Sequence, residues 1–162
     1  MKGMKRIIIF SDTHGDIRRC EDVINNFPYR ITAIFHAGDY ARDAEDIQSI
    51  YPDIPVYYVC GNTDMFTTAP VEGTVMIDGV KIFLTHGHEY RVKQEARFTT
   101  LKRKAEEVGA GLVIFGHTHI PTTEFHQKTT LINPGSIRYD GHYAVAEIES
   151  GRVKTAIFEH EW

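Results

Sequence analysis

Apolar residues gather in short runs along the chain, and polar residues follow each run directly. The runs lie at residues 7–10, 31–35, 56–60, 80–85 and 112–115. Runs of this length that are rich in β-branched residues are typical of buried strands. Apolar residues at helical spacing occupy the first two intervals, over 17–27 and 43–51. Strands that alternate with helices predict βαβ units and a parallel sheet.

Residues that start and stop helices agree with this pattern. Asp16 is placed to be the N-cap of the first helix, and Pro28 stops that helix. A third helix is predicted over 93–108, because Phe98, Leu101, Ala105 and Val108 form one apolar stripe; Gly109 would cap its C-terminus.

The later part of the chain has a different pattern. Residues 74–77 and 80–85 flank Asp78-Gly79, which predicts a hairpin with a type I′ turn. Four further strands are expected over 122–128, 129–133, 143–148 and 152–158, and we expect them to be antiparallel. The sequence therefore predicts one α/β domain over residues 1–162, parallel early and antiparallel late. We expect two mixed sheets packed face to face, with helices outside.

Composition narrows the function classes. Of the 162 residues, 42% are hydrophobic and 25% are charged, as in soluble globular proteins. The formal net charge of −4, with no long Lys/Arg run, argues against broad nucleic-acid binding. No signal peptide and no membrane-spanning segment is expected. Two cysteines, Cys20 and Cys60, suggest a reducing compartment, so a cytoplasmic location is expected.

Five predicted strands end beside a glycine and potential metal ligands. These side chains are Asp12 and His14, Asp39, Asn62 and Asp64, His86 and His88, and His117 and His119. In sheets with crossover helices, sites form where the carboxyl ends of strands meet. Each cluster alone has an ordinary alternative: Asp12 could cap a turn, Asp39 and Asp64 could form Asx-turns, and His36 or His86 could be a hydrogen-bonded core histidine. Their repetition at five strand ends favours one shared site.

The mixture of side chains indicates metal chemistry. Carboxylates, one carboxamide and several imidazoles are too many ligands for one ion, and they suit two borderline divalent ions. Two ions about 3.5–4 Å apart commonly act in displacement at phosphorus. Such a pair would leave a positive pocket in an acidic protein, which would attract a phosphate anion.

These motifs also carry a family resemblance. Asp12-Thr13-His14, Gly38-Asp39, Gly61-Asn62-Thr63-Asp64, His86-Gly87-His88 and Gly116-His117-Thr118-His119 occur in the order found in the calcineurin-like metallophosphoesterase superfamily. The chain resembles its small bacterial and archaeal single-domain phosphodiesterase branch, from Ile7 to about Arg138, including the loop Asn133-Pro134-Gly135-Ser136. The resemblance implies a four-layer α/β/β/α fold.

The resemblance also implies a ligand set and a reaction. The first metal would be held by Asp12, His14 and His119, the second by Asn62, His86 and His117, and Asp39 would bridge both. A hydroxide between the two divalent ions would attack a small phosphodiester. Mn²⁺ is the ion that we expect, with Ni²⁺, Zn²⁺ and Mg²⁺ left open.

One position departs from the common superfamily pattern. Many members have a histidine after Gly-Asn, where this chain has Thr63, and a threonine hydroxyl cannot act as a general acid near neutral pH. Asp64 then has no histidine to orient. We include Asp64 and His88 with Asp39 and Asn62 as catalytic candidates. The leaving group could be protonated by His88, by a metal-bound water or by no group, which predicts better turnover of aryl than of alkyl esters.

Three further features of the sequence have alternative interpretations. Relatives of this small fold include a retromer subunit that binds proteins, so a non-catalytic scaffold is the alternative function. A homodimer or a larger homo-oligomer is an expectation, and Tyr57, Tyr58 and Phe66 are either interface residues or core residues. Arg138 is either a phosphate ligand or a surface or interface residue.

Overall fold

Two mixed five-stranded sheets form the centre of the molecule. The computed structural model describes residues 3–65 and 67–161, so Phe66 lies outside the described residues. In spatial order, the first sheet contains β10 (Arg152–Glu159), β9 (His142–Glu149), β1 (Lys5–Phe10), β2 (Ala33–His36) and β3 (Val56–Tyr58). The second sheet contains β4 (Glu72–Ile77), β5 (Val80–Thr85), β6 (Leu112–Ile114), β8 (Thr129–Asn133) and β7 (Thr122–His126).

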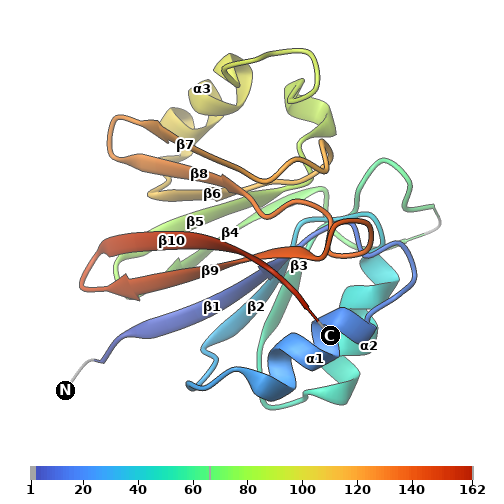
Figure 1. Ribbon diagram of the computed structural model, residues 1–162. Coiled ribbons are helices and arrows are strands. Elements are labelled where there is room, and N and C mark those ends of the chain that lie inside the picture. The colour runs from blue at the N-terminus through green and yellow to red at the C-terminus, as the bar shows by residue number, and fades with distance from the viewer. Residues whose placement is uncertain (1–2, 66, 162) are drawn as a thin grey trace.

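The helices cover the outer faces of the two sheets (Figure 1). α1 (Arg18–Asn26) and α2 (Ala41–Ile50) pack on the first sheet, whereas α3 (Thr99–Val108) packs on the second. A short 3-10 helix, η1, spans His88–Tyr90. The four-layer α/β/β/α arrangement that was predicted from the sequence is therefore confirmed.

Strand β1 shows how the apolar runs produce these layers. Side chains alternate between the two faces of a strand. Ile7 and Ile9 point into the core between the sheets, and Ile8 and Phe10 point into the core beneath α1 and α2. All four side chains are fully buried. A run without polar positions is required because both faces of the strand are covered.

The orientation of the late strands differs from the prediction. The last four strands do form two antiparallel pairs, β7 with β8 and β9 with β10. The two pairs lie in different sheets, however, and β8 also pairs in parallel with β6. In the first sheet the parallel strands β1, β2 and β3 lie on one side and the antiparallel strands β9 and β10 on the other. In the second sheet the parallel strands β5, β6 and β8 lie between two antiparallel edge strands, so the expectation of parallel pairing early and antiparallel pairing late was wrong for this sheet.

The third helix is shorter than predicted, because it begins at Thr99 and not near residue 93. Phe98 has a left-handed backbone (φ 55°), which interrupts a helix, and its buried ring packs on Phe115 with 5.1 Å between ring centroids. The Glu95 carboxylate accepts hydrogen bonds from the backbone N–H and the hydroxyl of Thr100. These contacts fix a separate turn before the helix. The Gly109 cap is confirmed.

The strand register brings the polar loops to one level. Phe10 lies beside His36 in the β1–β2 pair, and Leu84 lies beside Ile114 in the β5–β6 pair. Loops after these parallel strands therefore leave the sheets together, at the right of the view in Figure 1. Within the part of the chain that is described, no helix is both long and apolar enough to cross a bilayer.

Candidate metal centre

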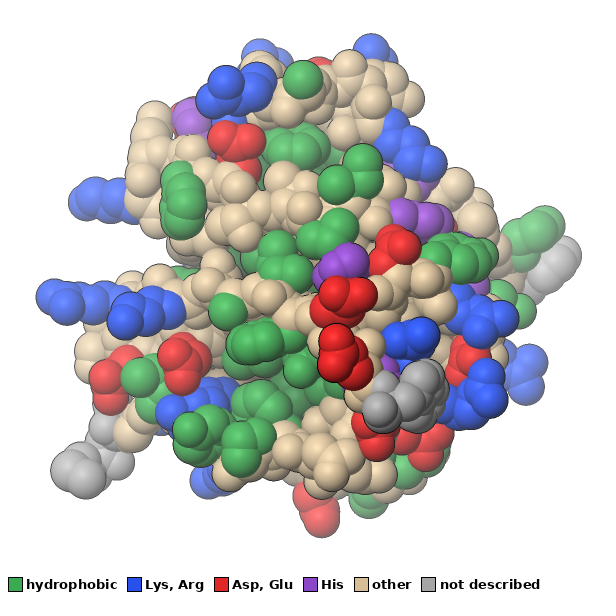
Figure 2. Space-filling view, viewed as in Figure 1, with side chains coloured by type: hydrophobic (Ala, Val, Ile, Leu, Met, Phe, Trp, Pro, Cys, Tyr) green, Lys and Arg blue, Asp and Glu red, His purple; other side chains and the backbone are tan. Residues whose placement is uncertain are grey.

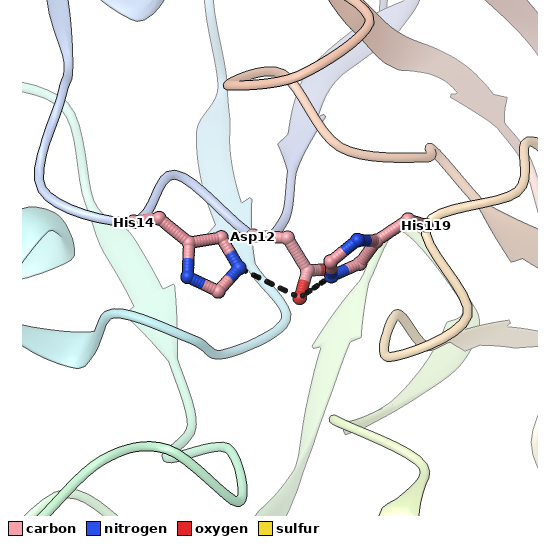
Figure 3. Close-up of side chains that lie close together, drawn as sticks. All are labelled: Asp12, His14 and His119. Atoms are coloured by element: carbon pink, nitrogen blue, oxygen red, sulfur yellow. Dashed lines mark hydrogen bonds and ion pairs between the residues drawn. The ribbon is translucent and has the colours of Figure 1, made fainter.

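Asp12, His14 and His119 form a first cluster at the ends of β1 and β6. The His119 Nε2 atom lies 3.1 Å from Asp12 Oδ1, and His14 Nε2 lies 3.7 Å from the same oxygen. Figure 3 shows the two imidazoles on either side of the Asp12 carboxylate, with a ring nitrogen of each directed at it. One ligand atom from each residue lies within 4.8 Å of the others.

Asp39, His86 and His117 form a second cluster with the same spacing limit of 4.8 Å. His86 Nε2 lies 3.2 Å from Asp39 Oδ2 and 3.1 Å from the Asn62 side-chain oxygen. The same His86 atom is 4.0 Å from Asp12 Oδ1 in the first cluster. The two clusters are thus neighbours, and together with Asn62 they contain all seven ligands that the family resemblance implies.

A hydrogen bond to the backbone fixes the orientation of the His86 ring. Its Nδ1 donates a hydrogen bond of 2.6 Å to the Ala37 carbonyl, which leaves Nε2 directed into the cluster. Hydrogen bonds of this kind orient metal-binding histidines. Burial lowers the pKa of His86, but the hydrogen bond with Asp39 and the negative charges of Asp12 and Asp39 together outweigh burial, so the pKa is raised. Burial also opposes ionisation of Asp39, yet His86 and the Thr63 N–H hold the pKa of Asp39 below its usual value.

The other imidazoles differ in their charge preference. Hydrogen bonding to Asp12 raises the pKa of His119. Burial, followed by the positive charge of His86, lowers the pKa of His117 to about 4. A neutral imidazole is the form that binds a metal ion. His117 therefore offers a free lone pair near neutral pH.

Most of the candidate ligands have an unusual backbone conformation. Five residues of the ligand set have positive φ angles: Asp12 (55°), His14 (46°), Asp39 (45°), His117 (71°) and His119 (62°). Left-handed backbone is uncommon for residues other than glycine, and such strain gathers at functional sites. The fold holds these side chains in place at a conformational cost.

Two glycines allow the loops to approach one another. A Cβ atom on Gly61 would collide with the Asp39 carboxylate, and a Cβ atom on Gly116 would collide with the Ser11 hydroxyl. The glycines that precede the ligands in the sequence are therefore needed for close approach.

Asp64 contacts the backbone of the neighbouring loops. Its Oδ2 accepts hydrogen bonds from the N–H groups of Gly61 (2.6 Å) and Asp39 (3.2 Å), and its Oδ1 accepts one from Ala41 at the start of α2 (2.7 Å). The side chain thereby ties the Asp39 loop to the Asn62 turn. These contacts favour a positioning role over direct contact with a substrate.

Several buried polar residues support the site, and only one of them, His36, was named from the sequence, as a possible hydrogen-bonded core histidine. His36 joins Thr13 (2.9 Å) to the Gly38 N–H (3.1 Å), and Asp43 accepts a hydrogen bond of 2.7 Å from the Gly15 N–H. Burial lowers the pKa of His36, which is neutral in this contact. The sequence offered one indication only, because His36 directly ends an apolar strand.

The loop at residues 133–136 holds the two ends of the first cluster. The buried Ser136 hydroxyl donates to the Asp12 carbonyl (2.9 Å), and the Asn133 amide donates to the Gly116 carbonyl (3.0 Å) and to the Thr118 hydroxyl (2.9 Å). The family resemblance includes this loop. Its function in the structure is to fix the position of the residues that carry Asp12 and His119.

His88 and Lys93 lie at the edge of the site. The ring of His88 is 5.5 Å from that of His86 and 6.1 Å from that of His117, measured between centroids. Burial and the charge of His86 lower the pKa of His88. The ammonium group of Lys93 contributes positive potential, which helps to lower the pKa of His117 and partly opposes the rise in the pKa of His119. Lys93 was not identified because the sequence placed it at a helix start. Arg138 instead donates to Asp16 at 2.9 Å.

A pocket adjoins the second cluster. It measures about 590 Å³ and is bounded by the Thr63-Asp64 turn, by Tyr40 and Arg42 at the start of α2, and by Thr67 and Thr68. This volume is in the usual range for small-molecule sites. Figure 2 shows histidine side chains reaching the surface beside acidic and apolar groups on the same side of the molecule as these loops.

The residues present are suited to divalent ions. The His14 Nε2 atom is buried and has no hydrogen-bond partner among the described residues, as is also the case for His88 Nδ1. A buried polar atom without a partner is costly. Imidazole and carboxylate donors that converge without a thiolate suit Mn²⁺, Zn²⁺ or Ni²⁺. A metal ligated by His14 would satisfy its Nε2 atom.

The fold and the site together define a class of metal-dependent phosphoesterases, and comparison with known proteins agrees. A model of the calcineurin-like phosphoesterase superfamily domain matches residues 4–151. The chain belongs to this superfamily. Family membership and the two ligand clusters support divalent-metal binding and phosphoester chemistry.

Several relatives belong to the small branch that was predicted. A probable metallophosphoesterase, YsnB of Bacillus subtilis, is 31% identical over 133 residues, which cover 82% of this chain and 75% of YsnB. Phosphodiesterase MJ0936 of Methanocaldococcus jannaschii is 28% identical over 149 residues, which cover 80% of this chain and 82% of that protein. A conserved uncharacterised protein from Streptococcus pneumoniae, predicted to be a phosphoesterase, has a TM-score of 0.82 and 28% identity, with 99% of this chain and 94% of that chain covered.

A protein named for vacuolar sorting shares the fold. Vacuolar protein sorting 29 from Cryptosporidium parvum has a TM-score of 0.76 at 14% identity, over 97% of this chain and 98% of that chain. At this identity the likeness concerns the fold alone.

Proposed function

We propose that this protein is a phosphodiesterase that hydrolyses small phosphodiesters at a centre of two divalent metal ions. The observation that carries the proposal is the pair of adjacent three-residue clusters, which His86 links through its contacts with Asp39 and its 4.0 Å approach to Asp12. Asp39 would bridge the ions, and Asn62 would complete the second ligand set.

The ions, Mn²⁺ in our proposal, would lower the pKa of a water between them and offset negative charge on the phosphate. The residues of the chain have separate tasks. Asn62 is exposed, and the N–H₂ group of its amide can donate to a phosphate oxygen. His88 is half-buried beside His86 and His117, where a neutral imidazole can donate a hydrogen bond to the substrate. Lys93 would favour the binding of an anion.

The pKa of His88 bears on the leaving group. Burial and the charge of His86 lower the pKa of His88, so the protonated imidazole is scarce near neutral pH. A leaving group that needs no proton is therefore favoured, and Thr63 supplies no acid. Aryl esters should react faster than alkyl esters.

The direct test is hydrolysis of bis-p-nitrophenyl phosphate by metal-free protein after addition of Mn²⁺, Ni²⁺, Zn²⁺ or Mg²⁺. We expect activity that requires metal and that falls at least 100-fold in Asp39→Asn. Asp53→Asn, an exposed carboxylate in the turn after α2, is the matched control and should retain full activity.

The same experiment separates the enzyme from the scaffold. Absence of hydrolysis with every ion, in protein that binds the ions, would favour a protein-binding role. The presence of all seven implied ligands supports catalysis.

A cytoplasmic location and a homodimer remain predictions. Tyr57 packs on Phe35 and is 36% exposed, and Tyr58 is half-buried, so neither presents a large free surface.

A further inference from the structure

Tyr139 is a large exposed ring beside the metal ligands that the reaction described above does not use. Its side chain is 61% exposed. Its ring centroid lies 5.3 Å from that of His14 and 5.5 Å from that of His119, at interplanar angles of 38° and 35°. The ring thus lies against both histidines of the first cluster and leaves much of its surface open to solvent.

Hydrogen bonds of the loop fix the backbone that carries this ring. The Tyr139 N–H donates to the Ser136 hydroxyl (3.2 Å), and that hydroxyl donates to the carbonyl of Asp12 (2.9 Å). The next residue is held as well, because the Asp140 N–H donates to the Ser136 carbonyl. One buried serine therefore connects the backbone of Tyr139 to a metal ligand, which is unusual for an exposed aromatic residue on a loop.

The environment of the ring indicates what it contacts. Arg138, its neighbour in the sequence, donates to Asp16 at 2.9 Å. A phosphate held by the first cluster would lie next to His14 and His119, so an ester group on that side of the phosphate would meet the ring of Tyr139. Aromatic rings pair well with other planar rings at centroid distances of about 4.5–7 Å.

We propose that Tyr139 is a specificity-determining residue that receives a planar aromatic arm of the phosphodiester, an aryl group or a nucleobase. The inference rests on the proposed function, because it uses a phosphate held at the metal centre. The aromatic arm of the phosphodiester would lie beside the first cluster, and its other arm would lie in the pocket beside Thr63.

The test is a set of binding measurements by calorimetry on the metal-loaded protein. Methyl phosphate, phenyl phosphate and AMP share the phosphate group and differ in the attached arm. In Tyr139→Ala, we expect affinity for an aromatic ligand to fall about three- to tenfold, the size of one ring contact, while affinity for methyl phosphate stays within twofold. Tyr139→Phe should match the wild type. Tyr29→Ala, which removes a 55% exposed tyrosine at the opposite end of the sheet, is the control and should change nothing.

The outcomes are distinct. If Tyr139→Ala loses affinity for phenyl phosphate alone, the ring receives an aryl arm; if it loses affinity for AMP alone, the ring receives a nucleobase. Equal losses for all three ligands, or a fall in metal affinity in Tyr139→Ala, would show that the ring only supports His14 and His119, and would overturn the inference. No loss for either aromatic ligand would also overturn it. Binding does not require turnover, so a failure of the proposed function, seen as no hydrolysis, is a separate result.

Discussion

Individual carboxylates in this site have different tasks although they are close in space, since the Asp39 N–H donates to Asp64 at 3.2 Å. Asp39 lies 3.2 Å from His86 and belongs to a candidate metal-binding cluster. Asp64 directs both oxygens to backbone N–H groups. A carboxylate that accepts several such bonds fixes loops, because each charge-assisted bond contributes about 1.5–3 kcal/mol.

Replacement of Asp64 by Asn is therefore expected to act through loop position. The amide presents an N–H₂ group to backbone N–H donors, so we predict a loss of about 1–3 kcal/mol in the free energy of unfolding of the metal-free protein. Metal affinity should fall together with stability. Urea denaturation and metal titration measure both. An unchanged unfolding free energy with abolished turnover would instead indicate direct catalysis by Asp64.

His36 should give the protein a defined dependence on pH. Its pKa in the folded state is lowered by burial, whereas the unfolded chain takes up the proton near pH 6.5. Below that pH the unfolded state binds more protons, so stability falls as the pH is lowered toward the folded pKa. The slope is at most about 1.4 kcal/mol per pH unit.

The comparison that isolates this effect is His36→Gln, which keeps a donor for Thr13. We predict that the metal-free wild type loses stability more steeply than the variant between pH 7 and pH 5 in urea denaturation. His86 and His119 have raised pKa values and contribute the opposite slope, but they are present in both proteins. Parallel curves would contradict the account of His36.

At the scale of single residues, the sequence predicted which side chains would lie together better than it predicted the residues that support them. Asp12, His14 and His119 could be named because each follows an apolar strand and belongs to a motif. The contacts of Ser136 and Asp43 span more than 120 and nearly 30 residues of chain, respectively. No local pattern marks such residues, because serine and aspartate are frequent in ordinary turns.

Junctions between strands and loops determine the geometry of the site at the next scale. Gly61 follows β3 closely and allows the Asn62 turn to touch the Asp39 carboxylate. The register of β1 with β2 places the Asp12 and Asp39 loops side by side, where the Asp12 N–H donates to the Gly38 carbonyl at 3.0 Å.

Gly61→Ala should therefore damage the metal centre. The added Cβ would meet the Asp39 carboxylate, which must move. We predict at least a tenfold loss of metal affinity by calorimetry, consistent with displacement of a ligand or of its support. Gly73→Ala in β4 is the matched control, because a Cβ there meets nothing within 4 Å. Equal affinities of the two variants would show that the close approach is not required.

The elements themselves were predicted well where both local and periodic patterns agreed. The hairpin turn at Asp78-Gly79 has positive φ at both residues (42° and 84°), as the predicted turn type requires. The start of α3 was predicted six residues too early, because the packing of Phe98 on Phe115 overrides the helical pattern. Such packing depends on residues distant in the sequence and cannot be inferred from periodicity.

In the whole molecule, residues from Asp12 to His119 meet because the loops that carry them leave the same end of the two sheets. The first sheet supplies Asp12, Asp39 and Asn62, and the second supplies His86 and His117. The division of the late strands between the sheets was not predicted. Strand β8 pairs with β6 and strand β9 pairs with β1, and the apolar patterns of these strands are too similar to show which pairs form. Metal ions bound by both sheets would join them.

Removal of metal should consequently lower the thermal stability. A ligand at 100 times its Kd stabilises the folded state by about 2.7 kcal/mol. For a chain of this size, that corresponds to a fall in Tm of about 5–10 °C when a chelator removes the ions. Differential scanning calorimetry with and without chelator measures it. The variant Asp39→Asn should show a much smaller shift, and a full shift in that variant would place the ions elsewhere.

The central claim is that two ions bind side by side between the Asp12 and Asp39 clusters. Anomalous diffraction from crystals of the Mn²⁺-loaded protein tests it most directly. The account predicts two peaks about 3.5–4 Å apart, one beside His14 and His119 and the other beside His86 and His117. A single peak, or peaks remote from these histidines, would contradict it.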